Sequence, residues 1–167
     1  MLKRLAAYIG EYKKQTLLTP VMIIFEVSLE VTIPFLMARI INIGIANSDT
    51  SYITTTGLAM IGIALFSLLF GALAARFSST AAAGFAKNLR AALFSNVQEF
   101  SFANLDKFST ASLVTRLTTD VTNAQNTFMM LIRMAVRAPL MLLSSILMTI
   151  SINSSLAVIF LLASPLL

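Results

Sequence analysis

Long apolar segments alternate with short polar ones along this chain, and their lengths predict membrane-spanning helices. Apolar residues dominate 17–46 and 53–75, and each run reaches the roughly 20 residues that a helix needs to cross about 30 Å of hydrocarbon. A third run covers 128–152. A fourth begins at 156 and reaches only residue 167, short of the usual minimum of about 17 residues. We therefore expect an all-α, polytopic membrane protein, truncated within the fourth span.

The second apolar run continues into a polar segment that also favours a helix. Residues 76–100 contain no proline, one glycine and many good helix formers. One helix over 52–100 is about 73 Å long at 1.5 Å per residue, so it projects on the order of 40 Å beyond the hydrocarbon. With a returning helix over about 111–150, the pattern predicts a helical hairpin outside the membrane over about 76–127.

Small residues recur at every fourth position on this long helix. Two rows result: Gly71, Ala75, Ser79 and Ala83, and Ala74, Ser78, Ala82 and Ala86. Rows of small side chains allow neighbouring backbones to approach closely. They predict close packing here and carry no functional assignment.

Residues 1–14 have the pattern of an amphipathic helix. Basic residues separate apolar positions that have helical spacing: Leu2, Leu5, Ile9 and Tyr12. Such a segment is predicted to lie on the membrane surface. A cleaved signal peptide is not favoured, because no long apolar core follows the first basic residues and Glu11 interrupts the segment.

The distribution of basic residues predicts the orientation. Lysine and arginine favour cytoplasmic loops. Four of them precede the first span and seven lie from Arg76 to Arg137, whereas the links 47–52 and 151–155 contain none. We therefore expect the amino terminus and the hairpin to be cytoplasmic and both links to lie outside.

Composition agrees with a membrane protein and excludes several kinds of chemistry. The chain is 57% hydrophobic and 11% charged, against about 25% charged residues in soluble domains. It has no cysteine and no histidine, which excludes disulfides, thiolate metal sites and histidine acid–base catalysis. The net charge of +5 does not indicate nucleic acid, because the basic residues are dispersed between apolar segments. We expect neither a catalytic residue nor a metal site.

Two carboxylates lie inside the first predicted span. Glu26 and Glu30 are four residues apart, hence on one helix face, and near the middle of the membrane at 1.5 Å per residue. Ionisable groups at that depth cost several kcal/mol and indicate function. Three interpretations stay open. The carboxylates line a water-filled cavity, where they attract cationic amphiphilic molecules, or they form an ion pair with an arginine on a neighbouring helix, or they belong to a solvated cavity wall that contacts no ligand.

Other candidate residues have a preferred structural interpretation. Arg39 is expected to extend to the headgroups at the outer end of the first span. For Arg133 and Arg137, anchoring at the inner interface is favoured over a place in the cavity wall. Soft apolar side chains in the same region suit varied ligands, although helix packing explains them equally well. They are Met129, Met130 and Met134.

The tip of the predicted hairpin is apolar for an exposed turn. Phe102, Leu105 and Phe108 cannot bury each other in a single turn, and each contributes roughly 1.5–3 kcal/mol when fully buried. We therefore expect the tip to insert into another surface. For Phe100 and Phe108, packing on the hairpin's own stems is equally well supported.

The segments "LRAALFSNVQEFSFANLDKFSTASLVTRLTTDVTNAQ" (89–125) and "MMLIRMAVRAPL" (129–140) resemble the second and third membrane helices and first intracellular loop of bacterial ABC exporters. The chain is most similar to half-transporters of the heterodimeric multidrug type. The resemblance implies a partial exporter membrane domain over 15–167 that moves drugs or other amphiphilic molecules out of the cell. It also implies a coupling helix, seated on nucleotide-binding domains, formed by Ser101, Phe102, Ala103, Asn104, Leu105, Asp106 and Lys107.

The resemblance also implies components outside this chain. A complete half-transporter has six membrane helices and an ATPase domain that binds ATP and Mg²⁺. The nearest match here to a phosphate-binding loop, "GLAMIGIA" (57–64), lacks the lysine and the serine or threonine, and it lies within a span. We therefore expect part of an ATP-hydrolysing translocase in a bacterial cytoplasmic membrane, paired with a second half-transporter. Alternatives are a lipid or peptide exporter, a proton-coupled secondary transporter and a membrane sensor.

Overall fold

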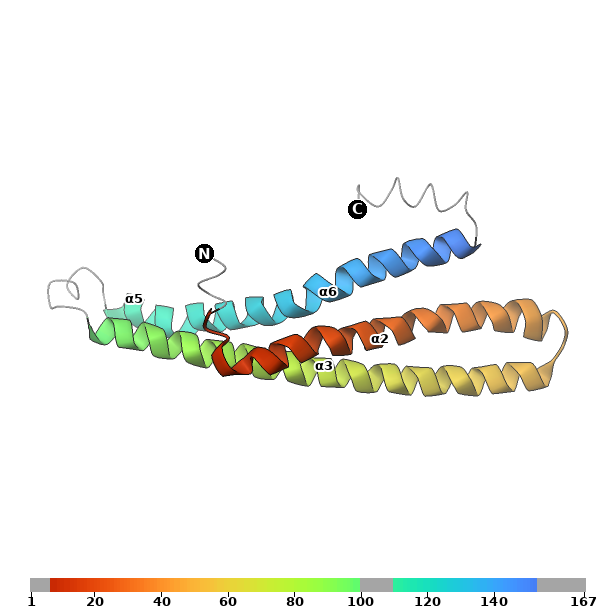
Figure 1. Ribbon diagram of the computed structural model, residues 1–167, viewed down its shortest axis with the longest axis horizontal. Coiled ribbons are helices and arrows are strands. Elements are labelled where there is room, and N and C mark those ends of the chain that lie inside the picture. The colour runs from red at the N-terminus through yellow and green to blue at the C-terminus, as the bar shows by residue number, and fades with distance from the viewer. Residues whose placement is uncertain (1–6, 100–109, 153–167) are drawn as a thin grey trace. The chain divides into compact units, whose positions relative to one another are not determined.

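The computed structural model describes residues 7–99 and 110–152, and all regular structure in them is helical (Figure 1). The helices are α2 (Lys13–Arg39), α3 (Thr50–Gln98), α5 (Thr110–Thr115) and α6 (Val121–Ile152). The chain forms two compact units. Unit 1 combines Met1–Pro20 with Ala74–Arg133, and unit 2 combines Val21–Leu73 with Met134–Leu167. The predicted all-α fold is confirmed.

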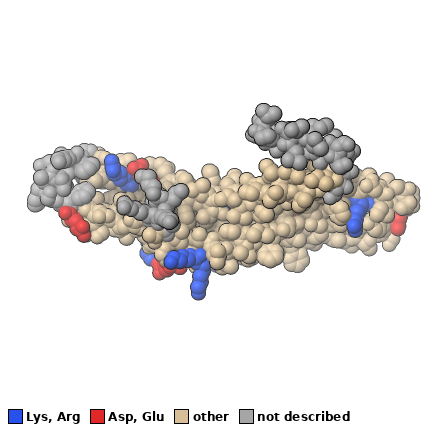
Figure 2. Space-filling model, turned by 45° about the horizontal axis from the view of Figure 1, so that its top comes forward, with Lys and Arg blue, Asp and Glu red and all other residues tan. Residues whose placement is uncertain are grey.

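Three helical stretches of the described residues are long and apolar enough to cross a membrane. They are Gly10–Ile45, Thr50–Gln98 and Ala111–Ile150. Many apolar side chains on them face outward, among them Leu58, Leu65 and Leu68, which are 62–70% exposed. The face drawn in Figure 2 includes a broad stretch without any charged side chain. The chain is a multi-pass membrane protein. Its expected fourth span lies outside the described residues.

In unit 2, α2 and α3 run antiparallel and are joined by a tight link. A π-helical segment (Ile40–Ile45) follows α2, and Ser48 adopts the left-handed conformation with φ of 52°. Asp49 then caps α3, because its Oδ1 accepts a hydrogen bond from the Tyr52 backbone N–H at 2.9 Å. A Cβ on Gly44 would lie 2.7 Å from Cγ1 of Ile53, so this close approach requires glycine.

In unit 1, the second part of α3 buries one of the two predicted rows of small residues. Ala74, Ser78, Ala82 and Ala86 are at most 2% exposed, whereas Ser79 and Ala83 of the other row are exposed. The Phe85 ring stacks on Phe128 of α6 with centroids 4.7 Å apart. The close packing predicted from the small residues is therefore confirmed for one row.

The amino-terminal segment differs from the regular helix that its spacing predicts. Gly10 has φ of 51°, which a right-handed helix cannot contain, and a 3-10 turn (Gly10–Tyr12) then leads into α2. The side-chain amide of Asn88 donates to the Tyr8 carbonyl at 3.0 Å and fixes this bend against α3. Residues 1–6 lie outside the described residues. Placement of the segment on the membrane surface stays a prediction.

Gly84 provides a test of this packing, because a Cβ built on it would overlap the ring of Tyr12. Gly84→Ala is expected to destabilise the protein by about 1–3 kcal/mol through overpacking. Thermal unfolding of the full-length protein in detergent measures the change. Ala83→Leu, at an exposed neighbour, is the control and should have little effect. The Tyr12→Ala background should remove most of the Gly84→Ala effect; an undiminished effect there contradicts the packing.

The returning helix is less regular than the sequence predicts. Between α5 and α6 the chain adopts a π-helical segment (Arg116–Asp120). The guanidinium of Arg90 on α3 donates from Nε to the Leu117 carbonyl at 3.0 Å. A π-helical segment alters the backbone hydrogen-bond pattern, and such segments occur frequently at functional sites. Arg90 thereby joins α3 to the π-helical segment Arg116–Asp120 in unit 1.

Candidate functional site: an ion cluster between two helices

One guanidinium joins both carboxylates of the first apolar segment in unit 2. Arg137 of α6 donates from Nη1 to Glu26 Oε1 at 2.6 Å and from Nη2 to Glu30 Oε2 at 2.9 Å. Both acids lie on one face of α2, because they are one helical turn apart. Each of the two terminal nitrogens of the guanidinium binds one carboxylate, and this fixes α6 against this face of α2.

The cluster has one more carboxylate than guanidinium. With both acids ionised, the formal charge of the three groups is −1. The side chains of Glu26, Arg137 and Glu30 are 14%, 33% and 41% exposed. The second oxygen of Glu26, Oε2, is buried and has no hydrogen-bond partner among the described residues. The cluster can therefore accept one further positively charged or hydrogen-bond-donating group.

Helix α3 completes the surroundings of Glu26. A Cβ on Gly71 would lie 3.0 Å from Glu26 Oε1, so glycine allows α3 to approach the carboxylate closely. The Ser67 hydroxyl donates to the Glu26 carbonyl at 3.4 Å, and the Phe25 and Phe70 rings stack with centroids 5.2 Å apart. Glu26 is thus held between α3 and Arg137, whereas Glu30 retains more exposure.

The structure contains the ion pair, one of the alternatives that the sequence left open. Glu26 and Glu30 pair with an arginine of a neighbouring helix, and that arginine is Arg137. Anchoring of Arg137 at the inner interface, favoured from the sequence, stays a prediction. Within the described ranges Arg133 makes no ion pair. Whether the cluster also faces a substrate cavity stays a prediction.

The methionines predicted beside these charges differ in exposure. Met130 and Met134 are 62% and 57% exposed, whereas Met129 is half-buried. Met129 and Met130, together with Arg133, belong to unit 1, and Met134 belongs to unit 2. None of them takes part in the ion cluster, which consists of Glu26, Glu30 and Arg137. A role for these side chains in binding substrate stays a prediction.

The chain matches a known protein family. Residues 16–167 match the family described as the ABC transporter transmembrane region. The chain belongs to this family. The ABC transporter membrane region is also 30% identical over 147 residues to the uncharacterized ABC transporter ATP-binding protein YfiB of Bacillus subtilis. The alignment covers 88% of the present chain and 26% of that relative, so the chain spans about a quarter of the relative's length.

For this ABC transporter membrane region, the predicted coupling helix over 101–107 lies outside the described residues. The structure does describe the two stems that lead to it, up to residue 99 and from residue 110. The sequence did not predict that Gly71 and Ser67 contact Glu26. Gly71 was identified only as a packing position, and its place on the row of small residues was the available signal.

Proposed function

We propose that this ABC transporter membrane region belongs to an exporter that uses ATP to move drugs or other amphiphilic molecules out of a bacterial cell. The observation that supports the proposal best is that two carboxylates share a single guanidinium within apolar helices of a transporter family, which gives a formal charge of −1 when both are ionised. A positively charged group on an amphiphilic molecule compensates that charge, while the exposed apolar side chains suit the rest of the molecule. Glu30, the more exposed carboxylate, is the expected contact.

The long helix α3 supports a mechanical link to ATP hydrolysis. At 1.5 Å per residue its 49 residues extend about 73 Å, more than twice the roughly 30 Å of hydrocarbon. Part of α3 must therefore leave the bilayer. We propose that residues 101–107 dock on an ATP-binding domain, where ATP and Mg²⁺ bind, and that the stems transmit its movement to the membrane helices.

The proposed function also includes an orientation in the membrane and a partner half. We propose that the amino terminus and the hairpin lie on the cytoplasmic side of the cytoplasmic membrane, as the basic residues indicate. A second half-transporter, of the heterodimeric multidrug type, supplies the other wall of the substrate cavity. The relative from Bacillus subtilis carries the words ATP-binding protein in its name and is much longer than the matched region, which agrees with an ATPase domain in the same assembly.

Transport by the full-length protein and its partner half in liposomes tests this function. The wild type is expected to move a fluorescent cationic dye when ATP is present, with or without a proton gradient. Glu30→Gln neutralises the surplus charge, so dye transport should fall roughly fivefold, the factor that corresponds to about 1 kcal/mol. Transport of a neutral amphiphile should be unchanged.

Glu11→Gln is the matched control, because it removes a carboxylate whose exposed pair with Lys87 contributes little. Dye movement driven by a proton gradient without ATP would instead support a secondary transporter. If transport still needs ATP but Glu30→Gln lowers the transport of cationic and neutral molecules equally, the protein is an exporter and the charge of Glu30 does not select its cargo.

A further inference from the structure

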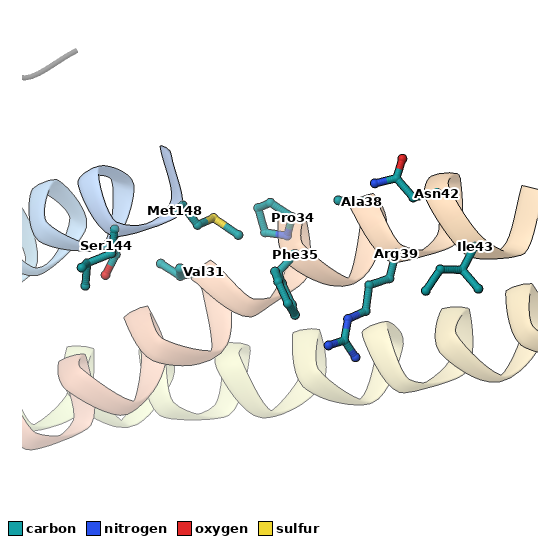
Figure 3. Close-up of a pocket in the computed structure, with 10 residues that line it drawn as sticks. Val31, Pro34, Phe35, Ala38, Arg39, Asn42, Ile43, Ser144 and Met148 are labelled. Carbon is teal, nitrogen blue, oxygen red and sulfur yellow. The ribbon is translucent and has the colours of Figure 1, made fainter. Parts of the chain in front are cut away.

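A second feature of unit 2 lies apart from the ion cluster. A half-open pocket of about 610 Å³ is formed by the last turns of α2, the π-helical segment and the last turns of α6 (Figure 3). Its walls are mainly apolar and include Val31, Pro34 and Met148. Three polar side chains also line it, namely Arg39, Asn42 and Ser144. Pockets of this size, apolar with a few polar groups, are typical of ligand sites.

Arg39 carries the only charge among the residues that line this pocket. Its guanidinium carbon lies 4.7 Å from the centroid of the Phe35 ring, and Figure 3 shows both side chains on the same side of α2. Among the described residues, no carboxylate pairs with Arg39 and no acceptor receives a hydrogen bond from it. A guanidinium with five donors therefore remains for an anionic group.

The position of Arg39 along the chain indicates its depth in the membrane. It is the last residue of α2, and the polar link over 47–52 begins eight residues later. At 1.5 Å per residue the link lies about 12 Å further along the axis. Because that link between two spans must leave the hydrocarbon, Arg39 lies near the boundary between acyl chains and headgroups.

We propose that this pocket binds one anionic phospholipid of the bilayer. The phosphate pairs with the Arg39 guanidinium. An acyl chain occupies the apolar wall beside Pro34 and Met148. Apolar walls next to an uncompensated positive charge suit an anionic amphiphile better than a free phosphate or a cationic molecule. The site is separate from the cargo site proposed at Glu30, where the surplus charge is negative.

Photocrosslinking in nanodiscs tests this proposal with the full-length transporter and its partner half. Phosphatidylglycerol and phosphatidylcholine, each with the same photoactivatable acyl chain, are compared, and labelled peptides are mapped by mass spectrometry. In the wild type, phosphatidylglycerol should label the segments around 31–43 and 144–148 roughly fivefold more than phosphatidylcholine. Arg39→Gln should reduce the ratio to about one, and Arg39→Lys should retain part of the preference.

Two further variants separate the site from general charge and from misfolding. Arg76→Gln removes one positive charge from unit 1 and should leave the lipid preference unchanged. Ala38→Phe fills the pocket but keeps Arg39, so labelling by both lipids should fall. Equal labelling by the two lipids in the wild type overturns the proposal. The proposal is also overturned if Arg76→Gln loses the preference for phosphatidylglycerol as fully as Arg39→Gln does. It is overturned as well if neither lipid labels these segments, the result expected if another part of the transporter covers the pocket.

Discussion

Replacing Arg137 with glutamine is expected to destabilise the membrane region by about 3–5 kcal/mol, because two carboxylates are then left without their counter-charge. Arg137 donates to Glu26 and Glu30 at the same time, so one substitution breaks both ion pairs between α2 and α6. Thermal or denaturant unfolding of the full-length transporter in detergent measures the loss.

Two variants control for this result. Arg133→Gln removes an arginine one helical turn earlier on α6, which makes no ion pair with a described residue, and should cost less than about 1 kcal/mol. The triple variant Glu26→Gln, Glu30→Gln, Arg137→Gln removes every charge of the cluster and should recover most of the stability. Wild-type stability in Arg137→Gln would mean that the ion cluster does not hold α2 and α6 together.

Gly71→Leu is expected to have the second largest effect. Even a Cβ at this position lies 3.0 Å from Oε1 and 3.2 Å from Cδ of Glu26, so the larger side chain must displace the carboxylate or separate α3 from α2. Overpacking of this kind costs about 1–3 kcal/mol, and the weakened ion pair with Arg137 adds to it. The same unfolding measurement applies, and transport of the cationic dye should fall in parallel.

Gly62→Leu is the matched control on the same helix. A Cβ on Gly62 has no atom within 4 Å outside its own helix, so the new side chain starts in open space. The substitution also favours the helix, by up to about 1 kcal/mol. The two variants should therefore change stability in opposite directions. Equal effects would show that glycine at 71 is not required for the approach of α3 to Glu26.

The long helices were predictable from the sequence because their signals are local. The segment after the second apolar run lacks proline and contains many good helix formers, and a helix over 52–100 was expected where α3 covers Thr50–Gln98. The return expected over 111–150 agrees with the stretch Ala111–Ile150. Local irregularities were missed, including the π-helical segment Ile40–Ile45. Gly10 adopts a positive φ, and Arg116–Asp120 is π-helical, where Arg90 from another helix binds the Leu117 carbonyl.

The ion cluster was predictable only in part. The spacing of Glu26 and Glu30 fixes that they share a face of α2, but not which helix that face meets. The partner depends on the rotation and the vertical offset of α6, which periodicity within one helix does not determine. The same limit applies to the small residues of α3. Both rows have equal spacing, yet tertiary packing buries Ala74 and Ser78 and leaves Ser79 and Ala83 exposed.

The ratio of acids to bases in the ion cluster also determines how a membrane potential acts on it. A pair of one acid and one base is electrically neutral, whereas two ionised acids on one base experience a force from the potential across the membrane. Moving one elementary charge through 100 mV changes the energy by about 2.3 kcal/mol, and a partial displacement changes it in proportion to the field crossed. Any rearrangement that shifts Glu26, Glu30 and Arg137 together along the membrane normal therefore depends on how strongly the cell is energised.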